Sequence, residues 1–195
     1  MTSRDKILAN IRKNNVVVDI ELPSYENFGT TYENKFEKFS VMIESVGGKA
    51  LKIDKKDLDK TILELYKDEK IIASNVEGFT LGNFDSNNEE DPHNLKDIDV
   101  AVVSGNFAVA ENGAIWMKNE NNRHRSLYFI AQNIVIVIDE KEIVSNMHEA
   151  YEKINFEDSG YGVFISGPSK TADIEQSLVI GAHGPKSGYV IFTKS

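Results

Sequence analysis

Two glycine–proline clusters in the C-terminal part of the chain gather residue types that can do chemistry. They read Ser166-Gly167-Pro168-Ser169 and Gly181-Ala182-His183-Gly184-Pro185, and Asp173 and Glu175 stand between them. Glycine lets a backbone approach a ligand closely, and hydroxyls bind anions. A carboxylate can hold a histidine in one tautomer while the imidazole moves a proton near neutral pH. We therefore predict a site here, with Asp173, Glu175 and His183 as candidate catalytic residues.

The residues after the first cluster could begin a helix, with Thr171 or Asp173 as its N-cap. Free amides at a helix N-terminus carry partial positive charge and bind anions. The alternative is a loop in which Asp173 and Glu175 only satisfy backbone amides. Neither a Walker A pattern nor G-x-G-x-x-G occurs in the chain, so nucleotide binding has no motif support.

A second constellation surrounds Glu111. An apolar run ends at Ser104-Gly105, and Glu111 stands shortly before Gly113, which begins the next run. In open parallel sheets ligands bind beyond the carboxyl ends of the strands. Glu111 is therefore expected at that edge and is a fourth candidate catalytic residue. Alternatively, it caps a turn or pairs with an arginine.

A third constellation, Arg123-His124-Arg125, places two arginines together in an acidic protein. Arginine grips carboxylate or phosphate with two parallel hydrogen bonds, although these residues could equally form a solvated turn. The spacing of histidines and carboxylates does not indicate the three or four converging ligands of a metal site. The predicted ligand-binding residues are Ser104, Gly105, Gly113, Arg123, Arg125, Ser166, Gly167, Ser169, Thr171, Gly181 and Gly184.

The elements that must position these residues follow from hydrophobic periodicity. Strands are expected over residues 50–53, 71–74, 98–103, 113–117, 134–138, 162–165 and 189–192, and helices over residues 3–13, 32–46, 56–66 and 143–154. Buried runs that alternate with amphipathic helices predict a mostly parallel sheet covered on both sides, a three-layer α/β/α sandwich. We predict an N-terminal helix and arm over residues 1–31 and the α/β domain over residues 32–195. Residues 76–94 read as a mobile surface insertion.

Composition excludes several classes of function. The chain has 195 residues, 41% hydrophobic and 27% charged, a balance typical of globular proteins. The absence of cysteine excludes disulfides, a thiolate nucleophile, and clusters or zinc held by this chain's own thiolates. A net charge of -9 without a basic stripe argues against nucleic acid. No signal core and no membrane-length apolar run occur, so we expect a cytoplasmic protein without a membrane partner.

Residues 166–185, SGPSKTADIEQSLVIGAHGP, resemble the signature of the lactate-utilisation protein C family, or LUD domain. Weaker similarity covers SRDKILANIRK at the start, AENGAIWM in the centre and the run NIVIVI. The family's central motif is usually Glu-Thr-Gly-Thr. This chain has Glu111-Asn112-Gly113-Ala114, so both of the family's hydroxyls are missing there.

The resemblance implies an α/β/α fold like that of the ribose-phosphate isomerase (RpiA), glucosamine-phosphate deaminase (NagB) and CoA-transferase superfamily. It also implies a component of a system that oxidises L-lactate to pyruvate together with cysteine-rich, iron–sulfur partner subunits. No cofactor is expected on this chain, and its own step, catalytic or accessory, stays open. In a catalytic role the loop amides and an arginine would bind the carboxylate. His183 would then take the hydroxyl proton.

Two other functions compete with this one. The chain could be a free-standing enzyme or binding protein for a sugar-phosphate, CoA-ester or folate-type anion, with Glu111 as nucleophile or base. It could also be a non-catalytic scaffold subunit whose glycine-rich loops dock partners. The first two functions require a small anionic ligand in a crevice between residues 104–113 and 166–185.

Overall fold

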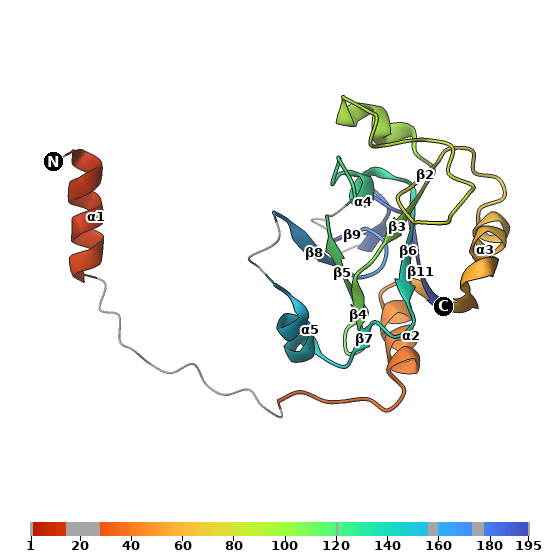
Figure 1. Cartoon of the computed structure of the whole chain (residues 1–195), viewed down its shortest axis with the longest axis horizontal. Helices are drawn as coiled ribbons and strands as arrows, with labels where there is room; N and C mark the ends of the chain where they lie inside the picture. The colour runs from red at the N-terminus through yellow and green to blue at the C-terminus, as the bar shows by residue number, and fades with distance from the viewer. Residues whose placement is uncertain (1, 15–27, 120, 156–159, 173–177, 195) are drawn as a thin grey trace.

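The computed structural model describes residues 2–14, 28–119, 121–155, 160–172 and 178–194. At its centre is a five-stranded sheet in the order β1-β11-β6-β3-β2, in which every neighbouring pair is parallel (Figure 1). Its strands are β1 (Lys49–Asp54), β2 (Ile72–Ser74), β3 (Val100–Ser104), β6 (Asn133–Asp139) and β11 (Ser187–Lys194).

The apolar runs of the central strands are buried on both faces of the sheet. In β6, Val135 and Val137 join one core cluster, whereas Ile134, Ile136 and Ile138 join the other. Successive side chains of a strand point to opposite faces, so a continuous apolar run is what a sheet covered on both sides requires. The same alternation occurs in β3 and β11.

Helices cover the two faces. α3 (Leu58–Leu65), which follows the 3-10 turn η1 (Lys55–Asp57), buries Leu58 and Ile62 on one face. On the other face, α2 (Lys35–Ser45) buries Phe39 and Ile43. Asn34 caps the start of α2, and its side chain accepts a hydrogen bond from the amide of Glu37. Gly47, where φ is +84°, follows the end of the helix. The predicted three-layer α/β/α fold is confirmed.

A second sheet lies on the α2 side, opposite α3 (Figure 1). Its order is β7-β4-β5-β8, and α5 packs on its outer face. A separate antiparallel hairpin joins β9 to β10. These elements, with the short helix α4, are β4 (Phe107–Val109), β5 (Ala114–Lys118), α4 (Leu127–Ile130), β7 (Ile143–Val144), α5 (Met147–Lys153), β8 (Gly162–Ile165), β9 (Lys170–Ala172) and β10 (Leu178–Ile180).

Two predicted helices are wrong in part. The helix expected over residues 143–154 begins only at Met147, because Ile143 and Val144 pair with β4 and Asn146 caps α5. The helix expected to begin at Thr171 or Asp173 is replaced by the strand β9, in which Thr171 pairs with Val179. β-branched residues favour such pairing over a helix start. The predicted anion site needed a helix that begins at Thr171 or Asp173, but residues 170–172 form a strand. Asp173 lies outside the described residues.

The insertion between β2 and β3 packs on the basic turn at residues 121–125. It contains the 3-10 helix η2 (Pro92–Asp97), whose Leu95 is fully buried. Asn87 accepts a hydrogen bond from the amide of Arg123 at 2.9 Å, and the ring of His124 bonds the carbonyl of Glu89 at 2.8 Å. The acid-rich insertion is thus attached to the turn by its polar groups.

The N-terminal helix α1 (Ser3–Asn14) begins with a reciprocal cap. The hydroxyl of Thr2 accepts from the amide of Asp5, and the carboxylate of Asp5 accepts from the amide of Thr2. None of the residues of α1 is buried. In the described ranges, no helix is both long enough and apolar enough to span a membrane.

Candidate functional site

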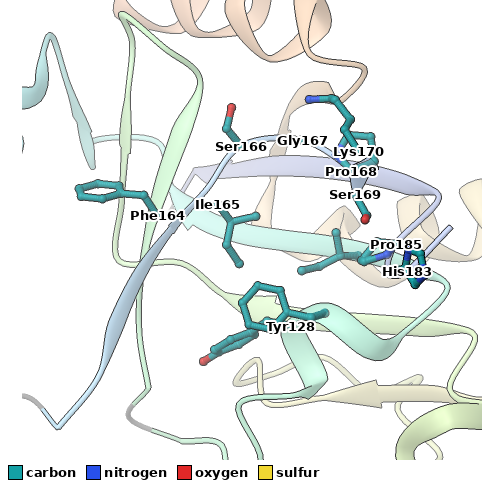
Figure 2. Close-up of a pocket in the computed structure, with 13 residues that line it drawn as sticks. Tyr128, Phe164, Ile165, Ser166, Gly167, Pro168, Ser169, Lys170, His183 and Pro185 are labelled. Carbon is teal, nitrogen blue, oxygen red and sulfur yellow. The ribbon is translucent and has the colours of Figure 1, made fainter. Parts of the chain in front are cut away.

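A hollow of about 300 Å³ lies between the loop after β8, the loop before β11, and α4 (Figure 2). Ile134, near the start of β6, and Pro185, just before β11, are among its lining residues. The hollow therefore opens at the amino ends of these parallel strands. A site was expected at the carboxyl edge of the sheet. The hollow differs from this expectation because the second cluster ends just before β11, at the amino edge of the central sheet, and the first cluster follows β8, which belongs to the other sheet.

Glycines bring the two clusters into contact. Gly167 has φ +71°, and a Cβ there would lie 2.9 Å from the carbonyl oxygen of Val46. A Cβ on Gly184 would lie 3.0 Å from the carbonyl oxygen of Phe129 and 3.0 Å from Cβ of Ser169. The amide of Ser169 donates to the carbonyl of Pro185 at 2.8 Å. The two clusters are therefore in contact. The crevice was predicted between residues 104–113 and 166–185, but no residue of 104–113 lines this hollow.

Few polar side chains line the hollow. Figure 2 shows the side chains of Ile165 and Ser169 pointing toward Tyr128, with His183 at one end. Within the described part of the chain, neither the hydroxyl of Ser169 nor the ring of His183 makes a hydrogen bond, and His183 is exposed. Both groups are thus positioned to bond a ligand.

Sequence reasoning missed Lys170. It is half-buried, and this burial lowers the pKa of its ammonium group. A Cβ on Gly167 would lie 3.5 Å from Nζ, and the amine is on the side of the loop away from Tyr128 (Figure 2). Nζ is thus near Val46, the C-cap of α2, where the helix dipole favours a cation. The available signal was a lysine between two hydroxyl residues in the conspicuous loop.

Sequence reasoning also missed the aromatic wall. Tyr128 is only 2% exposed, and its hydroxyl accepts a hydrogen bond from Nδ2 of Asn122 at 2.7 Å. Burial raises the pKa of Tyr128. Phe129 stands edge-on to it with ring centroids 6.1 Å apart and is 42% exposed. Nothing in the sequence separates these two rings from ordinary core residues.

The turn at Glu111 has its polar groups bonded within the protein. Oε1 of Glu111 accepts from the amide of Met147 at 2.7 Å, so this carboxylate caps the first turn of α5. Gly113 has φ +67°, and a Cβ there would lie 2.9 Å from the amide nitrogen of Ile43. The hydroxyl of Ser166 donates to the carbonyl of Asn112 at 3.2 Å, which links this turn to the loop of the hollow.

The remaining predicted residues lie elsewhere. Ser104 is exposed at the carboxyl end of β3, and Gly105 is packed so tightly that a Cβ would lie 2.8 Å from Ile115 and from Ile136. Arg123 and Arg125 are exposed and do not line the hollow, and the guanidinium of Arg125 stacks 4.5 Å from the ring centroid of Tyr161. Thr171 lies in β9 and does not line it either, and Asp173 and Glu175 fall outside the described residues.

The structure thus brings Ser166, Gly167, Ser169, His183 and Gly184 together around one hollow. Gly181 lines an adjoining hollow of about 530 Å³, which shares Phe129, His183 and Gly184 with the first. Among the described residues, no three histidine or acidic side chains lie close enough to hold a metal ion. The roles of all these residues stay predictions.

Known proteins similar to this chain carry a common name. Lactate utilization protein C from Bacillus pumilus (strain SAFR-032) is 32% identical over 117 residues, covering 56% of this chain and 49% of the relative. The protein of that name from Shouchella clausii (strain KSM-K16) is 30% identical over 154 residues, 69% of this chain and 66% of the relative. That from Exiguobacterium sp. (strain ATCC BAA-1283 / AT1b) is 27% identical over 84% of this chain and 80% of the relative. The chain matches only about half the length of the Bacillus pumilus protein.

A solved structure shares the fold. The crystal structure of a DUF162 family protein from Deinococcus radiodurans at 1.70 Å resolution matches with a TM-score of 0.66 over 82% of this chain and 96% of that chain, at 18% identity. The sequence profile of the LUD domain matches residues 4–193, which confirms the resemblance found in the sequence. Since this match spans nearly the whole chain, the protein belongs to the LUD domain family.

Proposed function

We propose that this protein is a component of a system that oxidises L-lactate to pyruvate. The observation that carries the proposal is the similarity to several proteins named lactate utilization protein C, one of them aligned over 80% of its length. The LUD domain profile supports the same assignment over residues 4–193.

This oxidation requires an electron acceptor. Conversion of L-lactate to pyruvate releases two electrons and two protons, and the electrons need an acceptor. The chain contains no cysteine, so it cannot hold an iron–sulfur cluster through its own thiolates. We therefore propose that cysteine-rich, iron–sulfur subunits accept the electrons while this chain binds a small organic anion.

The hollow between the glycine–proline clusters is the proposed binding site. His183 is its candidate proton acceptor, because a neutral imidazole nitrogen can accept a proton and this ring stands at the mouth without a hydrogen bond to the described residues. Ser169 would orient the ligand's hydroxyl. Glu111 is not proposed as a nucleophile, since its carboxylate already accepts the amide of Met147.

Growth complementation tests this function. The full chain is expressed in a Bacillus pumilus strain from which lactate utilization protein C has been deleted. Restored growth on L-lactate as sole carbon source is the expected result. Absence of growth, with the protein present and folded, would refute the assignment. A His183→Gln variant that complements fully would remove the catalytic role and leave an accessory one.

Affinity purification tests the partners. We expect the full chain to retain cysteine-rich subunits from the complemented strain, and the retained complex to reduce an artificial electron acceptor only when L-lactate is added. A Ser169→Ala, His183→Gln double variant that still retains the subunits but no longer supports reduction would favour ligand binding in the hollow. Loss of the subunits instead would favour the scaffold function.

A further inference from the structure

The hollow is larger and more apolar than a three-carbon acid needs. Its volume of about 300 Å³ is in the range of pockets that bury drug-sized ligands. Its apolar walls come from separate elements and are Tyr128, Phe129, Ile134, Phe164 and Ile165. Lactate offers only one methyl group to such walls. Most of their apolar surface would remain in contact with water if lactate alone were bound.

The described side chains that line the hollow include no carboxylate. The chain has 31 acidic residues, yet no aspartate or glutamate among the described residues lines this hollow or the adjoining one. The ionisable side chains that do line them are Lys170, Tyr128 and His183. In Figure 2, His183 and the amine of Lys170 lie at the periphery, while Ile165 and Ser169 point inward.

We propose that the hollow binds a 2-hydroxy or 2-oxo carboxylic acid whose side chain is aromatic or branched and larger than methyl. The choice of an acid depends on the proposed function, whereas the large apolar side chain is inferred from the apolar walls of the hollow. The body packs against Tyr128 and Ile165, and the hydroxyl of Ser169 bonds the 2-oxygen. The carboxylate stays at the mouth, near His183.

Calorimetry on the intact protein tests this proposal with three probes. 3-Phenyl-L-lactate has both the acid and the apolar body, L-lactate has the acid with a methyl group, and 2-phenylethanol has the body without the acid. We expect phenyl-lactate to bind roughly tenfold or more tightly than either, because it alone buries a ring and satisfies the polar groups. Equal affinity for L-lactate or for phenylethanol, or no binding of any probe, would overturn the proposal.

Variants locate the site. Phe129→Ala removes an exposed wall, and we expect phenyl-lactate affinity to fall roughly fivefold or more while the fold persists. Tyr151→Ala is the matched control, since Tyr151 is an aromatic residue of α5, 55% exposed, and does not line the hollow. Ile165→Trp should fill the space and abolish binding, with circular dichroism to verify folding. Unchanged affinity in Phe129→Ala would contradict the assigned site.

The two proposals fail separately. A chain that restores growth on L-lactate but binds none of the probes leaves the function standing and removes the ligand class. A chain that binds phenyl-lactate tightly but does not restore growth leaves the ligand class standing and removes the lactate-utilisation role.

Discussion

The turn at residues 111–113 and the two loops around Ser169 and His183 contain similar residue types, but their polar side chains differ in their hydrogen-bond partners. In the turn, Glu111 accepts the amide of Met147, and the side chain of Asn112 accepts the amide of Ala114. In the loops, Ser169 and His183 make no side-chain hydrogen bond to the described residues and face a hollow. Buried polar groups are nearly always paired inside a protein. A carboxylate near a glycine in the sequence can therefore be a helix cap or part of a binding site, and its hydrogen bonds in the structure distinguish the two.

The largest expected effect tests whether Gly113 in the turn is required for close packing or only for its backbone conformation. Gly113→Ala adds left-handed strain and places Cβ 2.9 Å from the amide nitrogen of Ile43, so we expect a loss of about 2–5 kcal/mol in the free energy of unfolding. Gly78→Ala is the control, since φ is +84° there and nothing lies within 4 Å of the new Cβ. It should lose only about 1–2 kcal/mol. Urea denaturation measures both, and equal losses would show that packing on α2 is unimportant.

The next effect tests the role of Glu111. Glu111→Ala removes the acceptor of the Met147 amide at the start of α5, and we expect a loss of about 1–2 kcal/mol in unfolding free energy. Phenyl-lactate affinity should not change, because Glu111 does not line the hollow. If binding were abolished and stability unchanged, Glu111 would be a ligand-binding residue and not a helix cap.

A hydrogen-bonded network close to the hollow tests whether proximity to the hollow is enough to affect ligand affinity. The hydroxyl of Tyr66 bonds Ser187 at 2.9 Å, and Ser187 donates to Asn133 at 2.8 Å, at the same sheet edge but on the α3 face. Tyr66→Phe should lose about 0.5–1.5 kcal/mol and leave binding intact. A change in ligand affinity would mean that proximity, not pairing, defines the site.

The same residue predicts a pH dependence. Burial raises the pKa of Tyr66 to about 12, above the value of about 10 for an unfolded tyrosine. The folded state therefore holds this proton more tightly, and its stabilisation is present below pH of about 10 and lost as the pH rises toward about 12. The stability advantage of the wild type over Tyr66→Phe should shrink across that window in urea denaturation. A constant difference would argue against the shift.

The smallest expected change in stability belongs to the hydroxyl of Ser169. Ser169→Ala removes no hydrogen bond of its side chain to a described residue, so the free energy of unfolding should stay within about 0.5 kcal/mol. Affinity for phenyl-lactate should fall roughly threefold to tenfold, the effect of one lost hydrogen bond. A large loss of stability would place Ser169 among the structural residues instead.

Periodicity predicts the central sheet because its strands are buried on both faces. The runs at residues 98–103 and 134–138 correspond to β3 and β6 within two residues at each end. The predicted helix 32–46 corresponds to α2, because its apolar face and the following glycines are both local signals. The short strands β4 and β7 escaped prediction, since pairing between distant segments, not local pattern, makes them strands.

The candidate site was harder to predict than the fold. Chemical composition singled out the two glycine–proline clusters, and the structure brings their described residues together. Local pattern could not tell which edge of the central sheet the loops reach, because it does not show that β8, the strand before the first cluster, belongs to the second sheet. It also could not show that the carboxylate of Glu111 turns toward α5, or that Tyr128 and Phe129 form a wall.

The position of β11 has a consequence for biosynthesis. This strand follows every other strand of the central sheet in the chain, yet it pairs with β1 on one side and β6 on the other. Until residues 187–194 leave the ribosome, β1 and β6 have no partner at those edges, and unpaired edges invite aggregation. A nascent chain interrupted before Ser187 should therefore depend on chaperones and be cleared by proteolysis, instead of persisting as a partly working protein.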